Sequence, residues 1–265
     1  MVKSLQNQRI KDVIKLNNVR ERRKKNCFVI EGVRELSLAI AGGYTVCSLF
    51  VCDELLNKGG IELIRKICIP AEKVSLEVFR KMAYREESDG IIAVAEPRRL
   101  TLDAVRLSDN PFIIILEAIE KPGNLGAILR TADAAGVDAV VVCDPKTDIY
   151  NPNTIRSSIG CVFTQQIVVC TSIEALQWLK QSGIRIYAAE LSASQWYYDA
   201  DFIQPSAIIL GTEAEGLTDF WIHNAEANIK IPMRGKIDSL NVSVSTAIIT
   251  FEAIRQKKIG QTHEI

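Results

Sequence analysis

Short, wholly apolar runs alternate with segments of helical periodicity along this chain, and this alternation restricts the folds that it can adopt. Residues 112–116 (FIIIL) and 139–143 (AVVVC) contain no polar residue. Strands that are apolar on both faces are typical of buried parallel sheets. Between them, residues 126–135 have a helical pattern that ends at Gly136, and parallel strands need such crossover helices. The sequence therefore predicts an α/β fold with a mainly parallel sheet.

The alternation occurs in two series that a polar stretch separates. We expect a small α/β domain over residues 1–97, a linker over residues 98–110, and a second, larger α/β domain over residues 111–265. Further strands of the second domain are expected at 166–169, 184–188, 207–210 and 228–231.

Charge is balanced over the whole chain but not along it. The protein has 32 basic and 32 acidic residues, yet residues 1–25 hold nine basic residues against two acidic ones. Residues 10–24 are predicted to form a basic helix. A solvated helix face explains such a run, and so does a polyanionic partner whose phosphates the helix neutralises.

Several functional classes lack support in the sequence. No apolar run is long enough for a membrane span, and the first residues have no signal-peptide core, so we expect a cytoplasmic protein. The seven cysteines include no CxxC pair, and only two histidines are present, so neither a disulfide framework nor a metal site is expected. No GxGxxG or P-loop motif follows a strand.

Polar residues follow the apolar run 112–116, at the kind of position where active sites of α/β sheets gather. This first cluster, residues 117–133, contains Asn124 between Gly123 and Gly126, and Arg130 one and a half helical turns later. Asn124 could cap the following helix, and Arg130 could pair with Asp133 on the surface. The functional alternative is that Arg130 holds a phosphate or a hydroxyl oxygen.

A second and a third polar cluster follow later strands. Residues 210–217 combine two glycines with Glu213 and a second acid, as in a capped turn or a ligand-binding loop. Residues 231–255 begin as a loop and continue as a helix from Leu240, whose first turns are crowded with short polar residues. A helix needs one such residue as a cap, so an over-capped helix and a binding surface both explain the pattern.

Together these clusters resemble the SpoU (TrmH) family of the SPOUT class of RNA 2′-O-ribose methyltransferases. All three motifs of that family occur in order, and residues 151–160 also resemble its NPxxxRxSxG segment. The matching residues are Asn124, Gly126, Arg130, Thr131, Ala132 and Gly136 in motif 1; Gly211, Glu213, Gly216 and Leu217 in motif 2; and Ile231, Pro232, Met233, Gly235, Ser239, Leu240, Asn241, Val242, Ser243 and Val244 in motif 3.

The resemblance implies a fold that patterning alone would not suggest. It implies a C-terminal SPOUT domain with a deep trefoil knot, preceded by a small substrate-binding domain related to ribosomal protein L30e. It also implies S-adenosyl-L-methionine as methyl donor and a homodimer. The residues carried over for the donor are Gly211, Ile231, Met233 and Leu240.

The resemblance further implies an activity: methyl transfer to a ribose 2′-OH of RNA, with 23S ribosomal RNA favoured over tRNA and no role for DNA. We expect Arg130 to stabilise the developing alkoxide. Its guanidinium has a pKa above ~12 and stays protonated, so it is a poor base. Asn124, Glu213, Ser239 and Asn241 are expected to orient or deprotonate the reacting groups. A tRNA ribose methyltransferase, a base-nitrogen methyltransferase and a non-catalytic RNA-binding relative are the alternatives.

Overall fold

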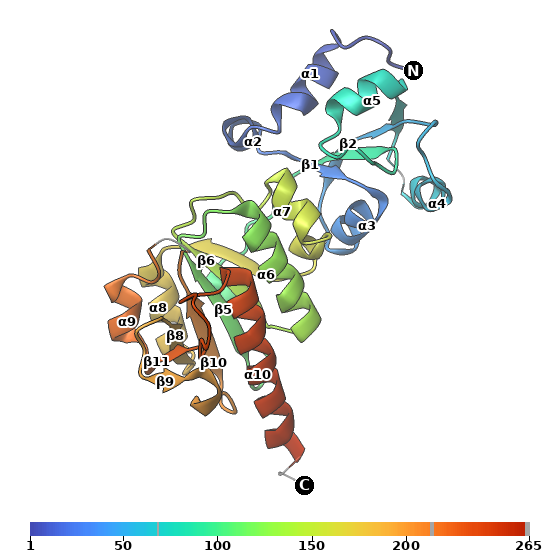
Figure 1. Cartoon of the computed structure of the whole chain (residues 1–265). Coiled ribbons are helices and arrows are strands. Elements are labelled where there is room, and N and C mark those ends of the chain that lie inside the picture. The colour runs from blue at the N-terminus through green and yellow to red at the C-terminus, as the bar shows by residue number, and fades with distance from the viewer. Residues whose placement is uncertain (68, 213–214, 263–265) are drawn as a thin grey trace. The chain divides into compact units, whose positions relative to one another are not determined.

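The computed structural model describes residues 1–67, 69–212 and 215–262 (Figure 1). The chain forms two compact units. The first comprises Met1–Arg98 and Asp148–Thr164, and the second comprises Arg99–Thr147 and Gln165–Ile265. The sequence had suggested one continuous second domain from residue 111 onward. Residues Asp148–Thr164 instead group with the N-terminal residues, so the chain passes between the units more than once.

The first unit is built on a four-stranded sheet in the order β1-β4-β2-β3, in which only β2 and β3 are parallel. Its strands are β1 (Phe28–Glu31), β2 (Val46–Val51), β3 (Ala71–Lys73) and β4 (Ile91–Ala95); its helices are α1 (Gln8–Lys15), α2 (Val19–Lys25), α3 (Val33–Ala41), α4 (Lys58–Lys66), α5 (Leu76–Met82) and α7 (Pro152–Ser157), with a 3₁₀ turn at Cys161–Phe163.

The predicted single basic helix over residues 10–24 is wrong, because the segment breaks at two asparagines. The side chain of Asn18 accepts a hydrogen bond from the backbone N–H of Arg20 and starts α2 as a new helix. Asparagine favours such caps over helix interiors because its side chain competes for backbone hydrogen bonds.

Side chains from distant parts of the sequence hold Asp148–Thr164 in the first unit. The Arg22 guanidinium donates to the Asp148 carboxylate over 2.6 Å and to the backbone oxygen of Leu16 over 2.8 Å. The ring of Tyr150 stacks on Phe28 with ring centroids 4.2 Å apart, and Phe163 lies on the same aromatic cluster. Sequence patterning could not predict this grouping, because it depends on pairings between residues far apart in the chain.

The second unit is built on a seven-stranded sheet in the order β7-β6-β5-β10-β8-β11-β9, and every pairing in it is parallel. This confirms the prediction of a mainly parallel sheet. Its strands are β5 (Phe112–Glu117), β6 (Ala139–Cys143), β7 (Ile167–Cys170), β8 (Arg185–Ala189), β9 (Gln195–Trp196), β10 (Ser206–Leu210) and β11 (Ala227–Lys230); its helices are α6 (Pro122–Ala135), α8 (Ser172–Gln181), α9 (Asp219–Asn224) and α10 (Val242–Thr262), with 3₁₀ turns at Leu102–Ala104 and Tyr197–Asp199.

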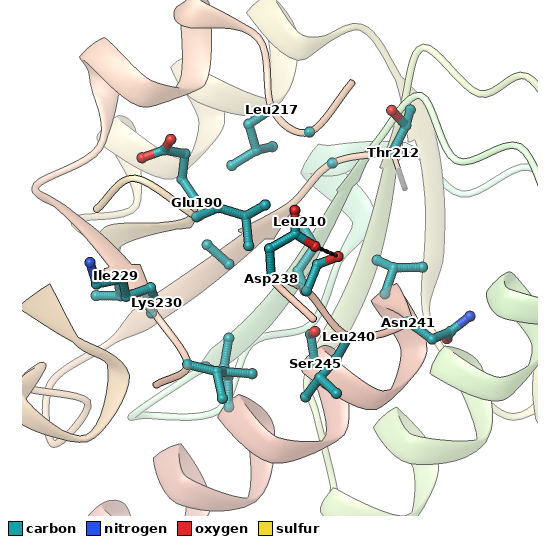
Figure 2. A pocket seen from close by; sticks show the side chains of 18 of the residues that line it. Glu190, Leu210, Thr212, Leu217, Ile229, Lys230, Asp238, Leu240, Asn241 and Ser245 are labelled. Atoms are coloured by element: carbon teal, nitrogen blue, oxygen red, sulfur yellow. Dashed lines mark hydrogen bonds between the residues drawn. The ribbon is translucent and has the colours of Figure 1, made fainter. Parts of the chain in front are cut away.

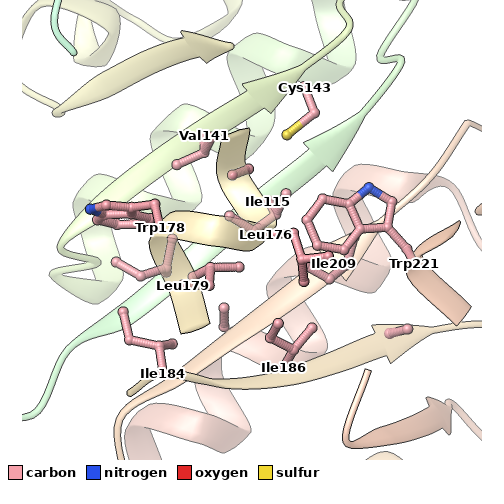
Figure 3. Close-up of a cluster of buried hydrophobic side chains, with 14 of the residues drawn as sticks. Ile115, Val141, Cys143, Leu176, Trp178, Leu179, Ile184, Ile186, Ile209 and Trp221 are labelled. Carbon is pink, nitrogen blue, oxygen red and sulfur yellow. The ribbon is translucent and has the colours of Figure 1, made fainter. Parts of the chain in front are cut away.

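The central strands of this sheet are buried on both faces, as their composition requires. All of β5 and β6 is buried. On one face, Ile115 and Ile209 pack with Leu179 of α8 and with the fully buried Trp221 of α9 (Figure 3). On the other face, α10 packs against α6, and the two helices lie side by side in Figure 1.

The strand order reverses between β5 and β10, which are neighbours in the sheet although β6, β7, β8 and β9 separate them in sequence. In open α/β sheets the crevice beyond the carboxyl ends of the strands at such a switch point is the usual ligand site. The ends of β5 and β10 carry the first two polar clusters, so the fold brings both to one edge. None of the described helices is both long enough and apolar enough to cross a bilayer.

Candidate active site

A pocket of about 560 Å³ lies beyond the carboxyl ends of β8, β10 and β11 (Figure 2). Its lining includes residues of the second and third clusters that lie far apart in the sequence. Six of the residues predicted to hold the donor or to act on the reacting groups are among them: Gly211, Ile231, Met233, Ser239, Leu240 and Asn241. Apolar side chains such as Leu210 and Leu217 complete the walls.

Gly211 lies at a close approach of two backbone segments. A Cβ atom there would lie 2.0 Å from the carbonyl oxygen of Gly216 and 2.6 Å from the backbone nitrogen of Leu217. Thr212 and Gly216 exchange backbone hydrogen bonds of 3.1 Å in both directions, so the loop after β10 turns back tightly on itself. Only glycine fits at position 211, and this brings main-chain groups to the pocket wall. Glu213, predicted as a site residue, lies outside the described residues.

A buried carboxylate at the end of β5, that of Glu117, holds the residue that follows this loop, Thr218. Glu117 accepts hydrogen bonds from the backbone N–H of Thr218 over 2.9 Å and from its hydroxyl over 2.7 Å. Thr218 immediately precedes α9. The sequence placed Glu117 in the first cluster without giving it a role. An acid directly after a wholly apolar strand was the available signal.

The third cluster combines helix capping with pocket lining. Helix α10 begins at Val242 rather than at Leu240. The side-chain oxygen of Asn241 (Oδ1) accepts hydrogen bonds from the backbone N–H of Ser243 over 2.9 Å and from its hydroxyl over 2.6 Å. The Thr246 hydroxyl is buried and donates to the backbone oxygen of Val242. Ser245 lines the pocket. Part of the polar run therefore caps the helix, as Asn241 does, and part of it lines a binding pocket, as Ser245 does.

Asn124 and Asn241 join the first cluster to the third. The side-chain amide of Asn241 donates to the side-chain oxygen of Asn124 over 3.2 Å. Asn124 is not a helix cap, because α6 starts at Pro122 and Lys121 occupies the N-cap position. It lies in the first turn of α6, where its side chain can reach the loop before α10.

Arg130 lies further along α6 and is exposed. It does not line the pocket of its own chain. Within the described part of the chain its side chain makes no hydrogen bond or ion pair, with Asp133 or any other residue. The structure of one chain thus brings Asn124 and Asn241 together and leaves the Arg130 guanidinium available to another molecule.

Four charged residues that received no role from the sequence, Lys121, Glu190, Lys230 and Asp238, also line the pocket. Glu215, the second acid of the second cluster, lines it as well. Glu190 directly follows strand β8, a position that the switch-point argument could have singled out. Near Lys121, the Lys146 ammonium pairs with Glu120 over 2.7 Å, and this hydrogen bond raises the pKa of Lys146.

Two protein families match this chain. Residues 111–251 match the SpoU rRNA Methylase family, and residues 7–93 match the MRM3-like substrate binding domain. The 23S rRNA (guanosine(2553)-2′-O)-methyltransferase RlmP of Bacillus subtilis (strain 168) is 31% identical over 94% of this chain and 97% of its own length.

Solved structures with the same fold span nearly the whole chain. A structure described as an RNA 2′-O ribose methyltransferase has a TM-score of 0.87 and 37% identity, and the match covers 97% of this chain and 99% of that one. The SpoU methyltransferase AviRb from Streptomyces viridochromogenes, in complex with the cofactor AdoMet, has a TM-score of 0.89 and 27% identity over 96% of this chain and 100% of that one.

Proposed function

Since this chain belongs to the SpoU rRNA methylase family, we propose that it transfers a methyl group from S-adenosyl-L-methionine to a ribose 2′-OH of ribosomal RNA, with 23S rRNA as the favoured substrate. One observation carries the proposal. Residues from two separate motifs, expected from the sequence to hold the donor, line a single pocket.

The pocket fits the donor in size and in chemistry. Its volume of about 560 Å³ lies within the ~300–1,000 Å³ that small-molecule sites occupy. Ile231 and Leu240 offer apolar walls for an adenine, and the close approach at Gly211 presents main-chain groups. When bound there, S-adenosylmethionine supplies an electrophilic methyl group on a sulfonium.

The residues of this chain then handle the acceptor. A ribose hydroxyl is a weak nucleophile that must be aligned and relieved of its proton. Arg130 stabilises the negative charge that develops on the ribose oxygen, because its guanidinium remains protonated. Asn124, held by Asn241, orients the ribose or Arg130, and Ser239 helps to position the reacting groups. Glu213 pairs with Arg130 or assists proton removal.

A second copy of the chain completes the site. Arg130 lies outside the pocket of its own chain, so an acceptor held by one chain can be presented to the donor of the other. Helix α10 also exposes two large apolar side chains two turns apart, Val244 (46% exposed) and Phe251 (51% exposed), and α6, which carries Arg130, packs beside it. A homodimer would cover this face. The proposed trefoil knot would lie at the segments that border one pocket, residues 211–212 with 215–217 and residues 231–241.

The first unit supplies RNA affinity. It matches a substrate-binding domain, and α2 exposes Arg20, Arg23 and Lys24, side chains that neutralise phosphates. DNA cannot accept the methyl group because it lacks the 2′-OH. A cytoplasmic location follows from a ribosomal RNA substrate.

The test uses S-adenosylmethionine with a radiolabelled methyl group. The protein is incubated with ribosomal RNA and, separately, with tRNA from cells that lack it, and the RNA is digested to nucleosides. We expect label in a 2′-O-methylnucleoside from ribosomal RNA. Label on a base or only in tRNA would replace the proposal with a different methyltransferase. Binding of S-adenosylmethionine without any methyl transfer would indicate that the protein is a non-catalytic RNA-binding relative.

A further inference from the structure

An exposed acidic side chain that is not among the matching motif residues, Asp238, lines the donor pocket. It lies in the loop before α10. Figure 2 shows its carboxylate between Leu210 and Leu240, joined by a hydrogen bond to the neighbouring serine. That bond comes from the Ser239 hydroxyl over 3.0 Å. Within the part of the chain that the structure describes, the Asp238 carboxylate forms no ion pair.

The described lining carries more negative than positive charge. Three acidic side chains, Asp238, Glu190 and Glu215, face two basic ones, Lys121 and Lys230. The Lys230 ammonium lies 5.0 Å from the ring centroid of Trp196, which is not part of the lining, so its charge is directed toward β9. The pocket thus favours a ligand with a net positive charge.

Asp238 is the acid best placed to act on the reacting end of the donor. It belongs to the same loop as Asn241, which is bonded to Asn124, and the acceptor must meet the methyl group on that side. In Figure 2 the Glu190 side chain lies apart from Leu210 and Leu240, and its carboxylate already accepts hydrogen bonds from the backbone N–H and the hydroxyl of Ser192.

We propose that the Asp238 carboxylate makes this pocket discriminate between donor and product by charge. This inference rests on the proposed function. S-adenosylmethionine carries a sulfonium, whereas S-adenosylhomocysteine has a neutral thioether in its place and is otherwise nearly the same molecule. A nearby carboxylate stabilises only the former. Transfer of the methyl group therefore removes the attraction at the moment when the product must leave.

The experiment measures dissociation constants by titration calorimetry on the full chain, with S-adenosylmethionine and S-adenosylhomocysteine as separate ligands. The readout is the ratio of the product constant to the donor constant. Asp238→Asn keeps the shape of the side chain and removes its charge, so we expect the ratio to fall about three- to tenfold, the effect of one partly screened charge. Glu190→Gln is the matched control and should leave the ratio within about twofold, because that carboxylate lies apart from Leu240 and already accepts hydrogen bonds from Ser192.

Salt gives a second readout. Raising the salt concentration should lower the ratio in the unaltered protein and have little effect in Asp238→Asn, because screening acts on the charge that the variant lacks. A ratio that Asp238→Asn leaves unchanged, or that falls only in Glu190→Gln, overturns the inference while donor binding itself still supports the proposed function. Failure of the unaltered protein to bind S-adenosylmethionine overturns both.

Discussion

Asn241 donates a hydrogen bond from its side-chain amide to the side-chain oxygen of Asn124 over 3.2 Å, although 117 positions separate the two residues in the chain. Through this contact the first turn of α6 is tied to the loop that closes the pocket. The same Asn241 caps α10 by accepting from the backbone N–H of Ser243. One side chain thus links the acceptor side of the proposed site to the donor side.

Asn241→Asp separates the two roles of this residue. An aspartate keeps the oxygen that accepts from Ser243 but has no amide to donate to Asn124. We expect thermal stability to stay close to that of the unaltered protein and the single-turnover rate to fall about 10-fold or more, because a misplaced catalytic group is costly. Asn241→Ala should in addition lose about 1 kcal/mol of unfolding free energy with the cap. Equal rates for Asn241→Asp and the unaltered protein would show that the contact is only structural.

Arg130→Ala tests the residue assigned to the ribose oxygen. Removing one group that stabilises a developing negative charge typically costs about 10²–10³ in rate. The dissociation constant for S-adenosylmethionine should not change, because Arg130 does not line the pocket of its own chain. Arg130→Lys keeps the charge and should retain part of the rate. Methyl transfer by Arg130→Ala at the normal rate would remove this assignment.

Gly211→Ala tests whether the tight turn after β10 builds the pocket. The added Cβ would lie 2.0 Å from the Gly216 carbonyl oxygen, so the loop must move. We expect calorimetry to detect at least a 10-fold weaker binding of S-adenosylmethionine, the equivalent of ~1.4 kcal/mol. Gly235→Ala is the control, since a Cβ there meets nothing within 4 Å. Similar losses in both variants would contradict the steric explanation.

Arg22→Ala and Arg23→Ala distinguish structure from RNA contact in α2. Arg22 is 5% exposed and bonds to Asp148 and two backbone oxygens, so its loss should lower the unfolding free energy by about 3–5 kcal/mol. Arg23 is exposed, and its loss should change stability by less than ~0.5 kcal/mol while weakening RNA binding. Urea unfolding and RNA filter binding measure the two effects. A stable Arg22→Ala would refute the role of Arg22 in holding Asp148.

Lys257 predicts a specific dependence of stability on pH. Burial lowers its pKa to about 8, and its ammonium bonds to Asn110 and to the Gln204 backbone oxygen. The unfolded chain then binds the proton more tightly than the folded one, so this group makes stability rise between pH ~8 and ~10.4, by at most about 3 kcal/mol. The rise should appear as the difference between unaltered protein and Lys257→Gln in urea unfolding at several pH values. Identical pH profiles would contradict it.

Most strands of the second unit could be predicted because short local patterns of apolar residues encode them. The wholly apolar runs that became β5 and β6 could only be buried parallel strands, and the family resemblance drawn from the three polar clusters agrees with the comparisons. The short strand β9 and helix α9 went unpredicted. Neither has the length that makes a periodic pattern visible, and tertiary packing, such as the burial of Trp221, stabilises them.

What the sequence could not predict depends on distant pairings. The assignment of Asp148–Thr164 to the first unit follows from contacts such as Tyr150 on Phe28, which no local pattern encodes. Asn124 was a candidate helix cap, but Lys121 is the N-cap and α6 starts at Pro122. The Asn124 side chain therefore accepts a hydrogen bond from Asn241. No local pattern marks Asp238 or Glu190 as a pocket residue, because only the fold places them at one pocket.

The most direct test of the central claim is a map of ribose 2′-O-methyl groups on total RNA from cells with and without this protein. The account predicts the loss of a 2′-O-methyl group from ribosomal RNA in the absence of the protein, and its return when the unaltered protein, but not Arg130→Ala, is supplied. A map that is identical with and without the protein, or a change confined to base methylation, would contradict the account.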